Sequence, residues 1–220
     1  MGAKILSSAT TVEEARWLEA KGCDAIIAQG LEAGGHRGMF LTEDLASQLG
    51  TLALLPQIVD AVKLPVIAAG GIADGRGIAA ALALGAAAVQ IGTAYLFTPE
   101  ATVAPLHRRA LAEAALAGAR DRPTVITRIF SGRPARAFVN RALRELDTVA
   151  AEAPAFPFAG NALLPLRAKA EAAGSDDFTP LWAGQAVALG RTLPAGELTR
   201  LLAAEAGVER SISRHRVRDI

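Results

Sequence analysis

The sequence is poor in the residues that mark the most easily recognised classes of protein. Of its 220 residues only Cys23 is a cysteine, which excludes a disulfide within the chain and a cysteine-based metal site. No histidine is followed by a second histidine or a carboxylate at the spacing of metal ligands, so we predict no metal. Aromatic residues make up 5% of the chain while 51% is hydrophobic, which predicts a core of small aliphatic side chains.

An excess of charge of one sign and long apolar runs are lacking as well. The formal net charge is +1, from 23 basic and 22 acidic residues, which gives no electrostatic reason to bind nucleic acid or an anionic membrane. No run approaches the roughly 20 apolar residues of a membrane span, and the first residues lack the apolar core of a signal peptide. We therefore expect a cytoplasmic protein with neither a nucleic-acid nor a membrane partner.

The first half of the chain alternates between apolar runs and helix signals. Helix starts are indicated at Thr11, which is followed by Glu14 as in a capping box, and at Asp74, and an apolar stripe between Leu55 and Val62 indicates another helix. Compact apolar runs of the kind buried on both faces of a parallel sheet span residues 3–9, 24–29, 65–70 and 87–92. This order predicts an α/β fold with parallel strands and right-handed crossovers.

The second half of the chain has a different character. We predict a helix over about 100–118, then a short extended piece followed by a helix that begins near Ala135, and a further helix that opens at Pro194. No change of composition marks a linker between domains. The basic side chains expected in solvent are His107, His215 and the arginines between residues 120 and 144.

Two neighbouring strand ends of the predicted sheet carry glycine turns. Ligands of parallel α/β proteins collect at the carboxyl ends of the strands. Gly70 and Gly71 can bring bare backbone N–H groups close to a ligand, and the helix that follows presents its positive end to an anion. Gly92 allows a similar approach, and Thr93 adds a hydroxyl group. A tight turn explains either motif alone, but together they favour a cofactor that carries phosphate.

The second apolar run leads into a histidine flanked by glycines. Gln29 has an amide that both donates and accepts hydrogen bonds, which suits the edge of a heterocycle. Gly34 and Gly35 remove side chains that would block approach, and His36 places an imidazole in the same strand-end region. A lone histidine is more often structural or solvated, so these residues alone leave both a catalytic and a structural role open for His36.

Four segments in the same order resemble bacterial nitronate monooxygenases over nearly the whole chain. They are AQGLEAGGHRG, LPVIAAGGIADGRGIAAALALGAAAVQIGTAYL, FSGRPARAFVNR and LWAGQAVAL. The resemblance implies a (β/α)8 TIM-barrel fold, an FMN cofactor, and oxidation by O2 of alkyl nitronates, propionate 3-nitronate among them, or of nitroalkanes. It implies no metal and no nicotinamide cofactor, because the flavin carries the redox chemistry.

The resemblance also assigns roles to individual residues by their position. His36 matches the family's active-site histidine, which hydrogen-bonds the nitronate oxygens or removes the α-proton of a neutral nitroalkane. Two positions near the second strand match flavin contacts, and those in the glycine turns match the segments that hold the phosphate and ribityl chain. These cofactor-binding positions are Gln29, Gly34, Gly70, Gly71, Gln90, Ile91, Gly92 and Thr93.

The chain lacks part of the barrel that the resemblance implies. A complete barrel has eight strands in about 250 residues, whereas four strands are predicted here, so the chain corresponds to the C-terminal two-thirds of the family's own. We therefore predict a single partial barrel domain over residues 1–220, with a barrel half over 1–98 and a mainly helical region over 99–220. Its exposed strand edges and apolar inner face would need cover from a homo-oligomer or a complementary N-terminal half.

Two other functions stay open on the sequence alone. Flavin-dependent enoyl-acyl-carrier-protein reductases share the AGGH and AAGGI segments, although SGRPARAFVNR and the arginine after His36 favour the nitronate enzymes. The missing strands also allow an inactive half-barrel that serves as a binding or assembly module.

Overall fold

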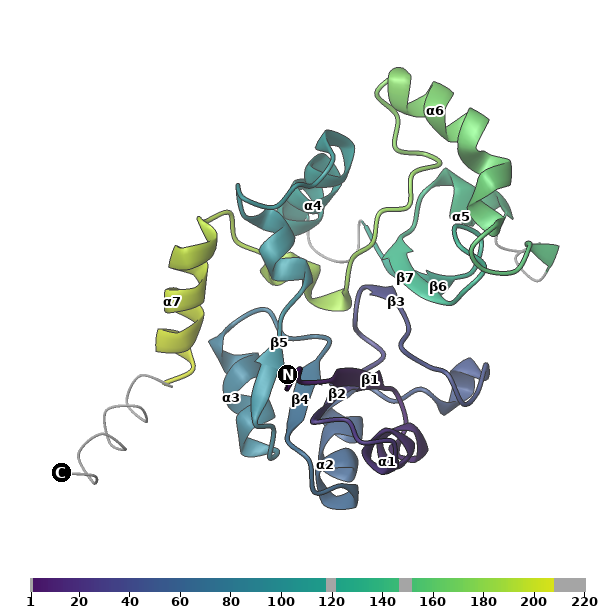
Figure 1. Ribbon diagram of the computed structural model, residues 1–220. Coiled ribbons are helices and arrows are strands. Elements are labelled where there is room, and N and C mark those ends of the chain that lie inside the picture. The colour runs from purple at the N-terminus through teal and green to yellow at the C-terminus, as the bar shows by residue number, and fades with distance from the viewer. Residues whose placement is uncertain (1, 118–121, 147–151, 208–220) are drawn as a thin grey trace.

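The computed structural model describes residues 2–117, 122–146 and 152–207, and its first half is built on a four-stranded parallel sheet (Figure 1). Neighbouring strands are hydrogen-bonded in the order β1-β2-β4-β5, with Ile26 opposite Val66. The four strands predicted from the sequence are confirmed, somewhat shorter than expected, as β1 (Leu6–Ala9), β2 (Ala25–Gln29), β4 (Val66–Ala69) and β5 (Ala88–Gln90).

Three helices cover one face of this sheet and enclose the main core. Side chains of a strand alternate between its two faces, and the buried residues Ile26, Ala28, Val66 and Ala68 form the face that packs against helical side chains such as Leu55. The core consists of small aliphatic residues, as the composition predicts. The covering helices are α1 (Val12–Ala20) and α2 (Thr51–Ala61), below the sheet in Figure 1, and α3 (Gly75–Ala83), at its left.

The starts of α1 and α3 confirm the sequence prediction. Thr11 Oγ1 accepts a hydrogen bond from the N–H of Glu14 at 3.2 Å, and the Asp74 carboxylate caps α3 in the same way. The second half of the predicted capping box is not formed, because the Glu14 carboxylate accepts from the N–H and the hydroxyl of Thr10 instead, both at 2.7 Å. Glu14 is fully buried. Its carboxylate bonds a loop outside its own helix.

The opposite face of the parallel sheet is only partly covered. Leu6 on β1 is 50% exposed, and Ile27 and Ile67 on the neighbouring strands are half-buried. Within the described part of the chain, β1 and β5 are the two edges of the sheet. The sheet therefore presents an accessible and partly apolar face.

A second sheet of short antiparallel strands replaces the helix predicted near Ala135. Its order is β3-β7-β6, and His36 lies opposite Ala135. That prediction was wrong because all four residues of β7 are buried, which a surface helix does not allow, and Arg136 in this strand donates two hydrogen bonds to the carbonyl oxygen of Leu31. The strands are β3 (Gly35–His36), β6 (Thr124–Thr127) and β7 (Ala135–Phe138), and the helix α5 (Arg141–Leu146) follows them.

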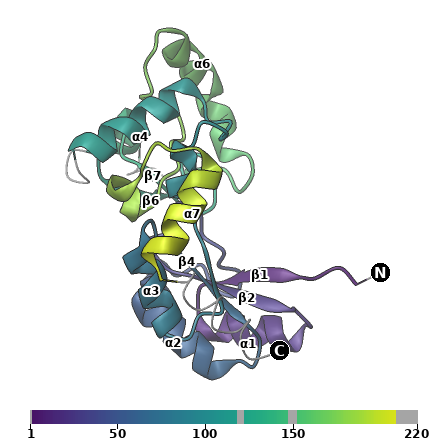
Figure 2. The ribbon, with the colours of Figure 1, turned by 90° about the vertical axis from the view of Figure 1, so that its left-hand side faces the viewer.

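The remaining helices lie in the second half of the chain. In Figure 2, α4, α6 and the antiparallel strands form an upper layer above the parallel sheet and α1–α3, and α7 lies between these layers. The helix predicted over about 100–118 begins at Pro105, and the helix predicted at Pro194 begins directly after it. None of the described helices is both long and apolar enough to cross a membrane. The elements are α4 (Pro105–Ala117), α6 (Leu164–Ala172), α7 (Ala195–Glu205) and the 3-10 helices η1 (Leu45–Ser47), η2 (Thr93–Phe97), η4 (Ala159–Leu163) and η5 (Gln185–Leu189).

Two basic side chains expected in solvent belong to the interior instead. His107 is half-buried, its Nε2 lies 3.0 Å from the carbonyl oxygen of Trp182, and burial lowers its pKa. Arg136 is buried because its guanidinium group bonds backbone carbonyl groups of two segments. The expectation for His215 falls outside the described residues.

Candidate functional site

Three neighbouring strand ends and a turn from the C-terminal half enclose a small cavity, here called the glycine cavity. Its volume is about 100 Å³. The strand ends belong to β2, β4 and β5, which are adjacent in the sheet, and the turn leads into η5. The cavity brings together most of the predicted cofactor positions, namely Gln29, Gly34, Gly70, Gly71, Gln90, Gly92 and Thr93, and its other lining residues include Glu32, Gly184 and Ala186.

The glycines of the two predicted turns leave room for a ligand. Gly70 and Gly71 have φ angles of +106° and +69°, in the left-handed region that glycine adopts without strain. A Cβ atom on Gly92 would meet no other atom within 4 Å, so open space lies beside this residue. The backbone N–H groups of Gly71 and Gly92 donate to no other residue in the described part of the chain. These N–H groups can therefore bind an anion.

Two of the predicted cofactor positions also hold the chain together. A Cβ atom on Gly34 would lie 2.5 Å from the backbone nitrogen of Gly184, so Gly34 permits two backbone segments to approach closely. Thr93 Oγ1 accepts the N–H of Gly184 at 2.9 Å, which leaves its hydroxyl hydrogen for another acceptor. Ile91, by contrast, packs against the main core and is not among the side chains that line the glycine cavity.

The N-terminus of α3 is already satisfied by the protein, which corrects the expectation that it presents its positive end to an anion. Asp74 Oδ1 accepts the N–H of Gly77, and Glu205 Oε2 accepts the N–H of Gly75, both at 3.1 Å. Two carboxylates thus occupy the positive end of this helix. An anion in the glycine cavity would rely on the N–H groups of the strand-end loops.

Glu32 brings a carboxylate to the glycine cavity, and the start of α2 compensates its charge. Thr51, the first residue of α2, donates its N–H to Glu32 Oε2 at 2.8 Å and its hydroxyl to the same oxygen at 2.9 Å. The positive end of the helix stabilises a negative charge at this place. Repulsion between Glu32 and a bound anion is thereby reduced.

Gln29 fastens the loop that carries His36. Its Nε2 donates to the carbonyl oxygen of His36 at 3.1 Å, and its Oε1 accepts the N–H of Gly38 at 2.7 Å. Both ends of the amide are therefore engaged by the protein itself. Because Gln29 also lines the glycine cavity, its contact with a cofactor stays a prediction.

Arg37 ties the same loop to the end of β2 from the buried side. Its guanidinium group donates to the carbonyl oxygens of Gly30 at 2.7 Å and Gln29 at 2.9 Å, and to Gln48 Oε1 at 3.0 and 3.1 Å. Burial, followed by the charge of Arg136, lowers the pKa of Arg37 to about 10. Arg37 therefore stays charged at neutral pH.

The contacts of Arg37 continue into a buried network that ends at Glu14. Gln48 Nε2 donates to Thr10 Oγ1 at 2.9 Å, and Thr10 in turn donates to Glu14. The other carboxylate oxygen of Glu14 accepts the N–H of Phe40 at 2.6 Å. The loop after His36 is thus held at several points, because buried polar groups are costly unless they are hydrogen-bonded.

The His36 ring lies between two aromatic side chains and is not part of the lining of the glycine cavity. Its centroid is 5.9 Å from the ring of Phe156 and 5.5 Å from that of Trp182, while the residue keeps an exposed side. Desolvation by this packing, followed by the charge of Arg133, lowers the pKa of His36 below its ordinary value of 6.5. His36 is therefore a neutral imidazole at neutral pH, the form that accepts a proton.

Ser131 contacts one nitrogen of this ring. Its Oγ lies 2.8 Å from His36 Nε2 and 3.2 Å from the carbonyl oxygen of Arg133, and its single hydrogen can go to either. In the tautomer that is protonated at Nε2, Ser131 accepts from Nε2–H and the lone pair of His36 resides on Nδ1.

Sequence reasoning missed several residues of this site, and those in the segments that resemble the family are Ser131, Trp182 and Gly184. They lie in FSGRP and LWAGQ, segments that carry the family resemblance, so that resemblance was the available signal. Nothing local in the sequence indicates that Ser131 meets His36, from which it is 95 positions distant. In the ranges that the structure describes, no three His, Cys, Asp or Glu side chains gather as a metal site.

The fold and the site define an α/β protein with parallel strands whose candidate site lies at the carboxyl ends of those strands. The family model for nitronate monooxygenase matches residues 1–205. The chain therefore belongs to the nitronate monooxygenase family, as the sequence motifs indicate.

Named relatives share much of the sequence but are longer than this chain. The nitronate monooxygenase of Pseudomonas aeruginosa is 47% identical over 208 residues, which cover 93% of this chain and 57% of that protein. A probable nitronate monooxygenase of Staphylococcus aureus is 41% identical over 196 residues, which cover 89% of this chain and 54% of that protein. The chain thus spans a little over half the length of these relatives.

Two solved structures also match nearly all of this chain but only part of their own length. Nitroalkane oxidase from Streptomyces ansochromogenes matches with a TM-score of 0.84 and 47% identity, over 96% of this chain and 59% of that one. FabK from Thermotoga maritima matches with a TM-score of 0.76 and 32% identity, over 98% of this chain and 64% of that one.

Proposed function

We propose that this chain is part of an FMN-dependent oxidoreductase that oxidises alkyl nitronates or nitroalkanes, propionate 3-nitronate among them, with O2. The observation that carries the proposal is the neutral His36 imidazole, held by Ser131 and packed against Trp182, on a loop that adjoins the glycine cavity. Membership of the nitronate monooxygenase family supports this reading of the site.

The residues of the glycine cavity fit the phosphate end of FMN. Open space beside Gly92 and the unused N–H groups of Gly71 and Gly92 provide a cradle for an anion. The cavity holds about 100 Å³, whereas complete cofactor sites hold roughly 300–1,000 Å³. The remainder of the cofactor therefore needs surface beyond this cavity. When bound, FMN would supply the redox chemistry by taking electrons from the nitronate and passing them to O2.

His36 would handle the proton of a neutral nitroalkane. In the tautomer that is protonated at Nε2, Nδ1 would accept the proton from the carbon that bears the nitro group, while Ser131 Oγ holds the ring through Nε2. The imidazolium so formed would donate from Nδ1 to an oxygen of the nitronate that the proton transfer creates. A nitronate supplied from solution bypasses this step and depends less on the basicity of His36.

We also propose that the chain is a partial barrel that another polypeptide completes. The sheet edges at β1 and β5 and the exposed Leu6 support this, since an apolar sheet face normally packs against something. The covering polypeptide would be a second copy of the chain or a complementary N-terminal half. The division into a barrel half over 1–98 and a mainly helical region over 99–220, and the cytoplasmic location, stay predictions. In the second region β6 lies where a short extended piece was predicted, whereas β7 lies where a helix was predicted.

The function is tested with the purified chain after reconstitution with FMN and desalting. We expect retained flavin absorbance and O2 consumption that tracks the loss of propyl-1-nitronate, without oxidation of NAD(P)H. Oxidation of NAD(P)H with a crotonyl thioester, and no nitronate turnover, would instead establish the enoyl-acyl-carrier-protein reductase. A colourless protein with neither activity, which light scattering finds in a complex with itself, would favour the binding or assembly module over an enzyme that a second copy of the chain completes.

A further inference from the structure

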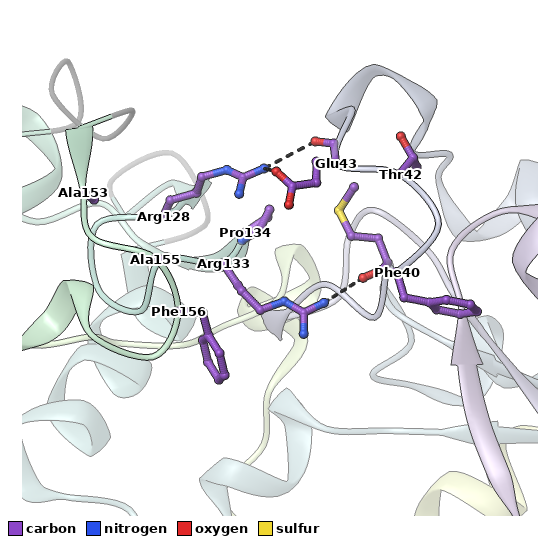
Figure 3. A pocket seen from close by; sticks show the side chains of 11 residues that line it. Phe40, Thr42, Glu43, Arg128, Arg133, Pro134, Ala153, Ala155 and Phe156 are labelled. Carbon is purple, nitrogen blue, oxygen red and sulfur yellow. Dashed lines mark hydrogen bonds and ion pairs between the residues drawn. The ribbon is translucent and has the colours of Figure 1, made fainter.

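A second and larger cavity lies on the other side of His36, and we call it the arginine cavity. Its volume is about 610 Å³. Segments that lie far apart in the sequence form its walls, with Phe40, Thr42 and Glu43 on one side and Arg128, Arg133 and Phe156 on the other (Figure 3). The cavity shares no lining residue with the glycine cavity.

The arginine cavity carries an excess of positive charge. Arg133 extends across it and donates from Nη2 to the carbonyl oxygen of Met39 at 2.8 Å, and its guanidinium carbon lies 5.8 Å from the centre of the Phe156 ring (Figure 3). This bond uses one of the five N–H groups of a guanidinium. The other N–H groups of Arg133 are without an acceptor among the described residues, so they can bind an anion.

Arg128 adds a second cation that a ligand can recruit. Its Nη2 lies 3.7 Å from Glu43 Oε2, and the Glu43 side chain is 90% exposed. An ion pair this open to water is weak. A carboxylate that enters the cavity can therefore compete with Glu43 for Arg128.

The arginine cavity is connected to His36 through Ser131 and Phe156. The backbone N–H of Arg133 donates to Ser131 Oγ, the atom that contacts His36 Nε2. Phe156 lines the cavity and also packs against the His36 ring. The arginine cavity and the His36 ring therefore share Phe156 as a neighbour, so a small molecule bound at the Arg133 guanidinium can extend toward the imidazole.

We infer that the arginine cavity binds a carboxylate group of the substrate, with Arg133 as the principal contact and Arg128 as the second. Planar guanidinium groups bind carboxylates through paired, charge-assisted hydrogen bonds. Arg133 is thus a specificity-determining residue that favours nitro compounds with a carboxylate tail over neutral ones. The inference rests on the proposed function for the reacting end of the substrate, while the anion site itself stands on the cavity and its charges.

The test compares two ligands that differ mainly in the tail. Binding of 3-nitropropionate and of 1-nitropropane to the FMN-loaded chain is measured without O2 by ligand-detected NMR, and kcat/KM is measured for the two corresponding nitronates. We expect Arg133→Met to lower the preference for the carboxylate ligand by about tenfold or more, the scale of a lost charge-assisted hydrogen bond. Arg133→Lys keeps the charge without the paired geometry and should retain part of the preference.

Glu43→Gln provides an independent test at an exposed position. Removal of its charge leaves Arg128 Nη2 with its 3.4 Å contact to the Glu43 carbonyl oxygen and without the ion pair, so the preference for 3-nitropropionate should rise by a few fold. Equal weakening of both ligands by Arg133→Met, or an unchanged preference in Glu43→Gln, would overturn the inference. A matching loss of FMN affinity in Arg133→Met would also overturn it, by assigning the cavity to the cofactor phosphate. Propyl-1-nitronate oxidation by the unaltered chain tests the proposed function separately.

Discussion

The two cavities on either side of the His36 loop are built from different kinds of chemical group. The glycine cavity, of about 100 Å³, offers backbone N–H groups at the ends of packed strands. The arginine cavity, of about 610 Å³, offers guanidinium groups on long side chains beside an aromatic ring. Both suit an anion, but strand ends supply donors from the backbone whereas the arginine cavity supplies them from long side chains.

This difference suggests that the glycine cavity holds a cofactor that stays bound and that the arginine cavity holds a substrate that is exchanged in each turnover. Fixed backbone donors lose little conformational entropy on binding and suit a cofactor phosphate that stays in place. Cations on side chains at an open cavity suit a substrate that must enter and leave. His36, between aromatic rings and held by Ser131, would meet whatever the two cavities bring together.

Removal of the group between the cavities should have the largest effect. We expect His36→Ala to lower turnover of neutral nitroalkanes by about 10²-fold or more, the scale of a lost general base. Flavin retention, measured by visible absorbance after desalting, should stay near that of the unaltered chain. Unchanged turnover would show that His36 is not the base.

Substitution in the glycine cavity should separate its ligand site from its structural glycines. Gly92→Val enters open space, so we expect stability to urea to change little while FMN affinity falls by about tenfold or more. Gly34→Ala is the matched control, since its Cβ would collide with the backbone of Gly184. It should lower the free energy of unfolding by about 1–3 kcal/mol. Equal FMN affinity in Gly92→Val and the unaltered chain would contradict the placement of the phosphate.

Loss of the hydroxyl that holds the His36 ring should have a smaller effect. We expect Ser131→Ala to reduce turnover of 1-nitropropane by several fold to about tenfold, because the ring loses the contact that orients it. Turnover of the preformed nitronate should fall less, since it needs no proton removal. Equal losses on both substrates would indicate a general structural role for Ser131 instead.

The smallest expected effect is a shift of a pH profile. Packing and the charge of Arg133 lower the pKa of His36, and the base is active when neutral. Activity on nitroalkanes should therefore fall only as the pH drops through a value below 6.5, the ordinary pKa of histidine. In Arg133→Met the acidic limb should move to higher pH, as kcat/KM measured against pH will reveal. An unmoved limb would show that this charge does not act on His36.

Local patterns made the parallel sheet predictable from the sequence. Compact apolar runs marked its strands, and Thr11 and Asp74 marked helix starts, because each signal depends on residues close in the chain. The strand at Ala135 escaped prediction because it lies between two other strands, and one of them, at His36, is distant in sequence. The glycine turns were visible for the same local reason, but their closure by Gly184 was not.

The sequence allowed single residues of the candidate site to be predicted, but not the contacts between them. The resemblance pointed to His36, yet the partner that orients the ring and the cation that lowers its pKa come from a segment that folds back onto it. Arg133 was expected among solvated arginines, and its place in a cavity beside His36 depends on packing that no local pattern encodes.

The buried chain of hydrogen bonds from Arg37 through Gln48 and Thr10 to Glu14 links α1, on the covered face of the sheet, to the loop that carries His36. The Glu14 carboxylate also accepts the N–H of Phe40, which lines the arginine cavity. Glu14 and Gln48 should therefore be kept when substrate preference is engineered at this loop, because they hold it in place, although neither would touch a ligand.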